Sequence, residues 1–201
     1  MSAPIHDLHP SNLLTYAGLG AALAAIAMAV DGGNFAAAGA LLALAALADT
    51  FDGRFARRFT RTNRQRQVGA QLDSLVDAIV FGVAPIVILS ALPGRTGGLM
   101  KAIWWLAAFC YLLATVTRLG FYNVEQDKSR FIGVPMPAVA LMWSTCLLWA
   151  VPWWSLTLLS SACAALMVAP VAIPRPRGVA FACFALWGVS LVTLHTLRLH
   201  R

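Results

Sequence analysis

The stretch FAAAGALLALAALADTFDG, residues 35–53, combines an apolar run of membrane-crossing length with two carboxylates at its end. A helix needs about 20 predominantly apolar residues to cross the hydrocarbon core of a bilayer. Asp49 and Asp52 stand near the C-terminal end of this run, where a carboxylate is costly unless it is paired, hydrated or bound to a metal. The stretch therefore predicts a transmembrane helix with a functional polar end.

The composition of the whole chain extends this prediction from one helix to a membrane protein. Of its 201 residues, 60% are apolar and 11% are charged, and the mean hydropathy is +0.74. The 15 basic and 8 acidic side chains are too few to cover a soluble domain of this size. The net charge of +7 could indicate nucleic-acid binding, but the basic residues stand between apolar runs, where attraction to anionic lipid accounts for them. We therefore expect no nucleic-acid partner.

Seven stretches of the chain are apolar and long enough to be candidate membrane helices. They cover residues 13–30, 35–53, 70–92, 101–122, 135–151, 153–173 and 179–197. Short polar, glycine-rich or proline-rich segments separate most of them. No Lys or Arg precedes Arg54, so the first stretch is expected to be a retained helix rather than a signal peptide. The predicted fold is an all-α, polytopic transmembrane helix bundle.

The distribution of Lys and Arg predicts the orientation of this bundle, because cytoplasmic loops are enriched in both. With the N-terminus inside, eleven of the 15 basic residues fall in cytoplasmic loops. These residues are Arg54, Arg57, Arg58, Arg61, Arg64, Arg66, Arg118, Lys128, Arg130, Arg175 and Arg177. We therefore expect a protein of the inner or cytoplasmic membrane whose acidic residues face the cytoplasm. Seven crossings would leave the C-terminus outside.

Half of the acidic residues belong to the second and third apolar stretches. They are Asp49, Asp52, Asp73 and Asp77. Residues three or four apart share a face of a helix, so each stretch presents one pair of carboxylates. Two such helices facing each other form a box of four carboxylates, whose hard oxygen ligands suit one or two Mg²⁺ or Mn²⁺ ions. No His or Cys accompanies them, so zinc is not expected.

Glycine and arginine residues flank the acidic pairs. Gly53 follows Asp52 directly, and Gly69 stands one helical turn before Asp73, which leaves room for a bulky ligand near the backbone. Arg57, one turn past Gly53, supplies a cation. Metal ions together with an arginine form a recurring apparatus for neutralising a pyrophosphate during phosphoryl transfer. The pattern therefore predicts this chemistry, in a bundle apolar enough to hold a lipid-tailed substrate.

The stretches DTFDGRFAR, residues 49–57, and GAQLDSLVD, residues 69–77, resemble the signature of the CDP-alcohol phosphotransferase family. Three further segments are similar to its CDP-diacylglycerol–serine O-phosphatidyltransferases, the phosphatidylserine synthases. They are LDSLVDAIVFGVAP at 72–85, RLGFYNVEQ at 118–126 and FIGVPMPA at 131–138. The resemblance implies a six-helix domain over residues 1–177, with residues 178–201 as an additional C-terminal transmembrane helix and tail.

The resemblance also implies the reaction and its residues. A phosphatidyl group would pass from CDP-diacylglycerol to L-serine, with release of CMP. Divalent metal, in two ions, would be held by Asp49, Asp52, Asp73 and Asp77, and Asp77 would act as the base on the acceptor hydroxyl. The CDP-lipid would contact Asp52, Gly53, Ala56, Arg57, Gly69 and Asp73. Our candidates for binding the acceptor are Arg118, Asn123, Ser74, Lys128 and Arg130.

Two departures from the family pattern keep the acceptor open. Eleven residues separate Arg57 from Gly69 where the family usually has eight, and we place the excess in a surface loop. Phe121 stands where the serine enzymes usually carry a basic residue. Glycerol 3-phosphate or an inositol phosphate is therefore the alternative acceptor, with arginines between residues 54 and 66 holding its phosphate.

Readings outside this family chemistry are also open at this stage. A cation-coupled transporter would place carboxylates in a helix bundle as well, and Arg54, Arg57 and Arg58 could simply neutralise them. Gly18 and the alanine-rich first two helices favour helix packing, so a homodimer is a further hypothesis. The histidines, among them His195, are expected at the surface.

Overall fold

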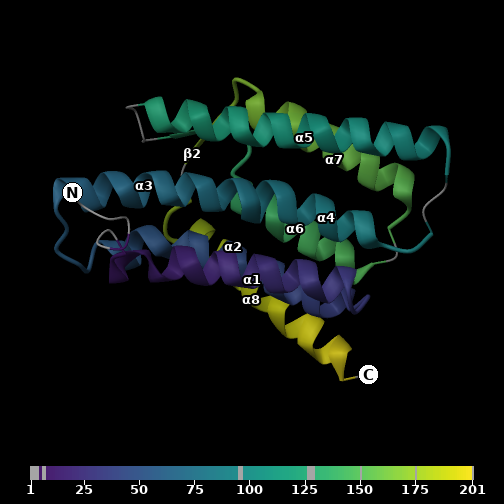
Figure 1. Cartoon of the computed structure of the whole chain (residues 1–201), viewed down its shortest axis with the longest axis horizontal. Helices are drawn as coiled ribbons and strands as arrows, with labels where there is room; N and C mark the ends of the chain where they lie inside the picture. The colour runs from purple at the N-terminus through teal and green to yellow at the C-terminus, as the bar shows by residue number, and fades with distance from the viewer. Residues whose placement is uncertain are drawn as a thin grey trace.

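The structure is a computed structural model, and it describes residue 5 and residues 8–94, 97–125, 130–149, 151–174 and 176–200. Helical rods lie side by side and run back and forth along one long axis (Figure 1). A short 3₁₀ helix, η2 (Pro10–Asn12), leads into the first rod. The helices that follow are α1 (Leu13–Val30), α2 (Phe35–Ala56), α3 (Asn63–Asp77), the π-helical η3 (Ala78–Val83), α4 (Ala84–Ala91), α5 (Leu99–Val124), α6 (Met136–Leu148), α7 (Trp153–Val168) and α8 (Val179–Leu199). The predicted all-α bundle is confirmed.

Five of the rods are long and apolar enough to cross a membrane. They span Pro10–Val30, Phe35–Ala56, Asn63–Ala91, Leu99–Val124 and Val179–Leu199. The apolar stretches predicted at 135–151 and 153–173 form the shorter helices α6 and α7, of 13 and 16 residues. Prolines border both: Pro135 and Pro152 occupy the N-cap positions, where a missing N–H costs no intrahelical bond. The chain is a membrane protein whose fifth and sixth predicted segments are shorter than expected.

The third rod begins earlier than residue 70, the start predicted from hydropathy. A capping box begins α3: the Thr62 side chain accepts from the Gln65 backbone N–H at 3.2 Å, and the Gln65 side chain accepts from the Thr62 N–H at 3.0 Å. Arg64 and Arg66 therefore lie on the first turn of a helix and not in a surface loop. The hydropathy pattern missed this turn because its residues are polar. The capping residues mark the start of the helix instead, and that signal is local.

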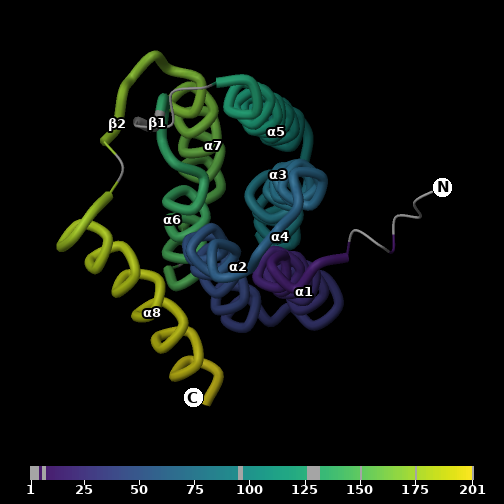
Figure 2. Tube along the Cα trace, turned by 90° about the vertical axis from the view of Figure 1, so that its left-hand side faces the viewer, coloured from purple at the N-terminus to yellow at the C-terminus, as the bar shows by residue number. Residues whose placement is uncertain are grey.

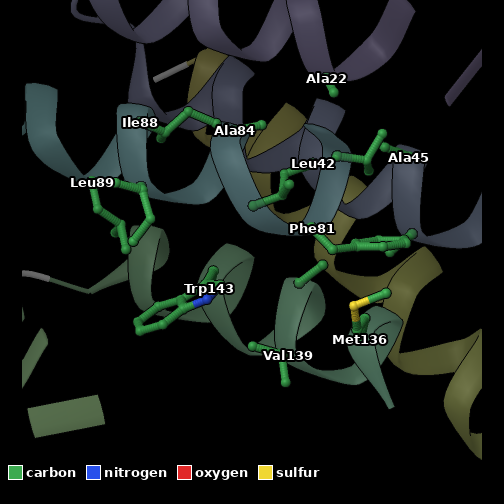
Figure 3. Packing of buried hydrophobic residues seen from close by; sticks show 14 of the residues in the cluster. Ala22, Leu42, Ala45, Phe81, Ala84, Ile88, Leu89, Met136, Val139 and Trp143 are labelled. Atoms are coloured by element: carbon green, nitrogen blue, oxygen red, sulfur yellow. The ribbon is translucent and has the colours of Figure 1, made fainter. Parts of the chain in front are cut away.

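The π-helical turn η3 was not predicted and follows directly after Asp77. Its Phe81 carbonyl accepts a hydrogen bond of 2.7 Å from the Tyr111 hydroxyl on α5. The indole N–H of Trp143 on α6 donates to the same hydroxyl at 3.2 Å. All three side chains are buried, and Figure 3 shows Phe81 and Trp143 in the apolar core. These hydrogen bonds satisfy a backbone carbonyl of the irregular π-helical turn. Inside an apolar bundle, water is not available to bond such a group instead.

Small residues hold α1 against α2. A Cβ on Gly18 would lie 3.8 Å from the Ala45 carbonyl oxygen and 3.8 Å from the Ala48 Cβ, so the two helices already touch through backbone and methyl groups. Ala22, on the same helix, is fully buried. In an apolar solvent, close backbone approach of this kind is a main source of helix association. The small residues that led to the homodimer hypothesis are thus used within one chain.

Two short strands, neither of them predicted, pair with each other: one in the segment expected as a loop after residue 122, the other at the end of the stretch predicted at 153–173. The strands β1 (Arg130–Ile132) and β2 (Ala172–Pro174) are antiparallel, with Phe131 opposite Ile173. Gly133 follows β1 with a φ of +72°, and a Cβ there would lie 2.2 Å from the Met167 carbonyl oxygen. Glycine is therefore required at this turn. The pairing brings the loop after α5 and the loop after α7 to one end of the bundle.

Helix α8 packs against α2 and α6 (Figure 2). His195 on α8, which we expected at the surface, is completely buried. Its ring lies over Gly39 of α2, where a Cβ would meet the imidazole at 2.2 Å. Its Nε2 is 3.2 Å from the Ser144 hydroxyl, and that hydroxyl donates to the Gly39 carbonyl at 2.8 Å. The place of His195 near the end of the chain did not make it exposed, because α8 buries the face that carries this residue.

Candidate active site

The C-terminal end of α2 and the middle of α3 bring three aspartates together. One carboxylate oxygen from each of Asp49, Asp52 and Asp73 lies within 4.8 Å of the other two, and all three side chains are half-buried. Asp49 and Asp52 are three residues apart on α2, so they share the face that α3 opposes. Three converging carboxylates form a hard-oxygen donor set that could hold a divalent cation. The sequence predicted these three residues as metal ligands.

The fourth predicted acid, Asp77, stands one turn beyond Asp73 at the end of α3. It is not part of the group of three whose ligand atoms lie within 4.8 Å. It nevertheless faces the same two hollows as Asp49 and Asp73, a narrow crevice against α1 and a larger cavity. Asp77 is thus at the site but on the far side of Asp73 along the helix.

The larger cavity has a volume of about 590 Å³ and lies between α2, α3, α5, α6 and α8. Its acidic lining consists of Asp49, Asp73 and Asp77. Arginines, polar residues and apolar residues complete the wall, among them Arg54, Arg118, Ser74, Asn123, Phe181 and Phe184. A hollow with carboxylates, cations and apolar surface fits a substrate that carries both charged groups and a lipid part.

Gly53 and Arg57 lie together at the end of α2. A Cβ built on Gly53 would have the Arg57 Nη1 atom as its near neighbour, at 3.8 Å. Ala56 is the last residue of the helix, and Arg57 occupies its C-cap position with an exposed side chain. The backbone at Gly53 is therefore open to a ligand with a cation beside it, as the spacing predicted.

Gly69 on α3 faces the start of the chain rather than empty space. A Cβ there would lie 3.1 Å from Oδ1 of Asn12 and 3.7 Å from Nη1 of Arg61. Asn12 is 4% exposed, and its Nδ2 atom has no hydrogen-bond partner among the described residues. A buried donor without an acceptor is costly, and it marks Asn12 as a residue of interest beside the acids.

Thr15 on α1 makes a polar contact with one of the acids. Its hydroxyl donates to Oδ2 of Asp52 at 3.4 Å. We did not predict a role for Asn12 or Thr15 from the sequence. The available signal was their spacing: two polar residues three apart share one face at the start of an apolar helix.

Three of the predicted acceptor-binding residues, Ser74, Arg118 and Asn123, lie on α3 and α5. The Ser74 hydroxyl donates to Oδ1 of Asn123 at 2.8 Å and also lies 3.2 Å from the Ala70 carbonyl oxygen. Arg118 is 7% exposed, and its guanidinium carbon is 4.6 Å from the centre of the Tyr122 ring. Within the described part of the chain, the Nε and Nη2 atoms of Arg118 have no hydrogen-bond partner.

Two further acceptor candidates, Lys128 and Arg130, follow α5 in the chain. Arg130 begins β1, where its backbone pairs with Pro174. Lys128 lies outside the described residues. Phe121, the position that left the acceptor open, is 45% exposed and does not belong to the described cavity lining.

Comparison with known proteins agrees with this geometry. The family model described as CDP-alcohol phosphatidyltransferase matches residues 8–173. Proteins of Mycobacterium tuberculosis, Bacillus subtilis and Methanocaldococcus jannaschii, each named CDP-diacylglycerol–serine O-phosphatidyltransferase, are 37% identical to this chain over 116, 90 and 103 residues. The alignments cover 52%, 44% and 51% of this chain and 37%, 48% and 46% of those relatives. The family resemblance of the two aspartate stretches is thereby confirmed, and the chain belongs to the CDP-alcohol phosphatidyltransferase family.

Proposed function

We propose that this protein transfers a phosphatidyl group from CDP-diacylglycerol to L-serine, forming phosphatidylserine and CMP. The observation that carries the proposal is the convergence of Asp49, Asp52 and Asp73 within 4.8 Å beside a cavity of about 590 Å³. Family membership and the printed names of the relatives support the same chemistry. Because those relatives are matched over less than half of their length, the substrates are our inference.

The carboxylates fit a divalent metal. Their oxygens suit Mg²⁺ or Mn²⁺, and we propose that Asp49, Asp52, Asp73 and Asp77 together hold one or two ions. A bound divalent ion would stabilise the negative charge of the pyrophosphate and of the leaving CMP. Gly53, Ala56, Arg57 and Gly69 are proposed to contact the CDP part of the donor, since the open backbone at Gly53 lies against the Arg57 guanidinium.

Asp77 is proposed as the base. When the serine hydroxyl oxygen attacks the β-phosphorus of the donor, a new P–O bond forms and the bond to the CMP oxygen breaks. The hydroxyl proton passes to the Asp77 carboxylate, and CMP leaves with the electron pair of the broken bond. The position of Asp77 in the same cavity wall as Ser74 and Arg118 supports this role.

Arg118 and Asn123 are proposed to bind the serine carboxylate and amine. A buried guanidinium with unpartnered N–H groups is the kind of donor that a carboxylate satisfies in bidentate fashion. Ser74 orients Asn123 through their 2.8 Å hydrogen bond. Phe121 lies outside the described cavity lining, so an apolar residue there is compatible with serine. Lys128 and Arg130 remain predictions.

A phosphate-bearing acceptor, glycerol 3-phosphate or an inositol phosphate, is the second candidate. Arg54 favours it, because this second arginine lines the same cavity as Arg118. Two cations on one wall could hold a dianionic phosphate as well as a carboxylate. Turnover measured with each acceptor alcohol must therefore decide between the two candidates.

We further propose that the protein is integral to the inner or cytoplasmic membrane, with the cavity on the cytoplasmic side. The described basic residues Arg57, Arg58 and Arg61 lie at the same end of the bundle as the acids, between α2 and α3. The positive-inside bias then places this end in the cytoplasm. The homodimer stays a prediction.

The test is CMP release by the purified protein supplied with CDP-diacylglycerol and Mg²⁺ or Mn²⁺. Parallel reactions contain serine, glycerol 3-phosphate, inositol phosphate or no acceptor. Release that requires both serine and metal would support the proposal. Release only with a phosphate-bearing acceptor would favour the second candidate, and absence of release from folded protein with every acceptor would refute both.

A further inference from the structure

Helix α8 lies outside residues 8–173, which match the family model, yet it forms part of the cavity wall. Phe181 and Phe184, on its first two turns, line the cavity together with Asp49 and Asp73 of the acidic cluster. The sequence indicated no functional residue on this helix. Its contribution to the site therefore comes from how it docks.

The docking of α8 along α2 is antiparallel and closely fitted. Near the far end, Gly39 meets the buried His195 ring, and in the middle a Cβ on Gly188 would lie 2.7 Å from the Leu47 side chain. At the cavity end, the rings of Phe51 and Phe181 meet edge to face, with centroids 5.6 Å apart. Close packing at three levels holds Phe181 in a defined position beside the end of α2.

The ring of Phe181 also contacts the guanidinium of Arg54. The Arg54 guanidinium carbon lies 3.8 Å from the centre of the Phe181 ring, which is cation–π geometry. Arg54 follows Phe51 by three residues, so both side chains project from the same face of α2 toward α8. The aromatic ring thus orients a cation that lines the cavity.

Arg54 is held by an aromatic face and not by an acid. Among the residues that the structure describes, no carboxylate forms a salt bridge with it, although Asp49 and Asp73 line the same cavity. An aromatic face attracts the cation without using its N–H donors. Within the described part of the chain no hydrogen bond uses these donors, so they can bind an oxyanion inside the cavity.

We propose that Arg54 and Phe181 form one substrate-binding unit, in which Phe181 positions the Arg54 guanidinium to bind an oxyanion of a substrate. The proposal rests on the function proposed above and assigns a role in it to the C-terminal helix. The oxyanion belongs either to the pyrophosphate of the CDP-lipid donor or to the carboxylate of the acceptor. Arg54 is the binding residue, and Phe181 is a positioning residue.

The test is a double-mutant cycle with Arg54→Gln, Phe181→Leu and both together. In each protein, KM and kcat are measured separately for CDP-diacylglycerol and for serine. Arg54→Gln is expected to raise one KM on the order of tenfold or more, because a charge-assisted hydrogen bond is lost. Phe181→Leu is expected to raise the same KM roughly threefold to tenfold, and to add nothing further in the Arg54→Gln background.

Two further variants separate positioning from general packing. Phe181→Tyr keeps an aromatic face and is expected to retain the wild-type KM. Leu186 lies on the same helix and is 63% exposed, so Leu186→Ala removes apolar surface away from the cavity and is expected to change neither KM. Thermal unfolding in detergent, measured for every variant, identifies any that fail to fold.

The substrate whose KM rises identifies the source of the oxyanion, and either source supports the unit. Unchanged KM values in Arg54→Gln, or effects of the two substitutions that multiply independently, would overturn it. If the wild-type protein shows no serine-dependent turnover, the proposed function fails by itself. The cycle is then measured as the thermal shift caused by CDP with Mg²⁺, by serine and by glycerol 3-phosphate. Coupled loss of one shift supports the unit, and shifts that Arg54→Gln leaves intact overturn it.

Discussion

Ser74 on α3 and Asn123 on α5 are joined by a hydrogen bond of 2.8 Å across the cavity wall, although 49 residues separate them in the chain. Ser74 stands between Asp73 and Asp77, whereas Asn123 lies in the last turn of the helix that carries Arg118. The bond therefore links the acidic cluster to the proposed acceptor-binding residues. It fixes the orientation of the Asn123 amide in the cavity wall.

Replacing Ser74 by Ala is expected to raise the KM for serine roughly threefold to tenfold with little change in kcat. The substitution removes a hydrogen bond that orients Asn123, and such a bond contributes about 0.5–1.5 kcal/mol. Steady-state CMP release at saturating CDP-diacylglycerol measures the effect. Ser161→Ala is the matched control, because among the described residues the Ser161 hydroxyl bonds only to the Thr157 carbonyl of its own helix, at 3.0 Å. An equal change in both variants would contradict the role of Ser74.

Replacing Asp77 by Asn is expected to lower kcat by roughly 10²- to 10⁴-fold, the usual contribution of a positioned general base. The amide has nearly the same shape, so the fold and much of the CDP binding should persist. Turnover is followed as CMP release, and CDP binding is measured by calorimetry in the presence of Mg²⁺. A wild-type rate would remove Asp77 from the role of base.

Removal of divalent metal is expected to stop turnover, and added Mg²⁺ or Mn²⁺ should restore it. Asp49→Asn and Asp73→Asn are each expected to raise the metal concentration needed for half-maximal activity, since each removes one of three converging ligands. Mn²⁺ binding, followed by electron paramagnetic resonance, gives the number of ions independently of turnover. Asp31→Asn, in the loop between α1 and α2, is the control. Turnover that persists in a chelator would refute the metal proposal.

Gly39→Ala is expected to destabilise the protein by about 1–3 kcal/mol, the typical cost of overpacking a close contact. The new Cβ would meet the His195 ring, so α8 must shift. Adding His195→Ala to Gly39→Ala should recover part of the loss, because the smaller side chain vacates the space. Gly20→Ala on α1 is the control, since a Cβ there has no neighbour within 4 Å among the residues that the structure describes. Thermal unfolding in detergent that does not distinguish Gly39→Ala from Gly20→Ala would contradict this packing.

Sequence alone determined the class of fold and the acidic half of the site. Apolar runs of membrane length can be recognised from local composition. Asp49 and Asp52 are three residues apart, so the helical period places them on the same face. The start of α3 escaped the hydropathy pattern because its first turn is polar. Its capping residues, Thr62 and Gln65, carried the signal instead.

Tertiary structure decided the contacts between helices. The approach of Asn12 to Gly69, the bond from Ser74 to Asn123 and the stacking of Phe181 on Arg54 each join residues far apart in the chain. Such pairs depend on the register of one helix against another. Small residues such as Gly39 set this register, because they allow a side chain of the neighbouring helix to approach closely. Local periodicity specifies the face that a residue occupies on its own helix, but not the residue that this face will meet.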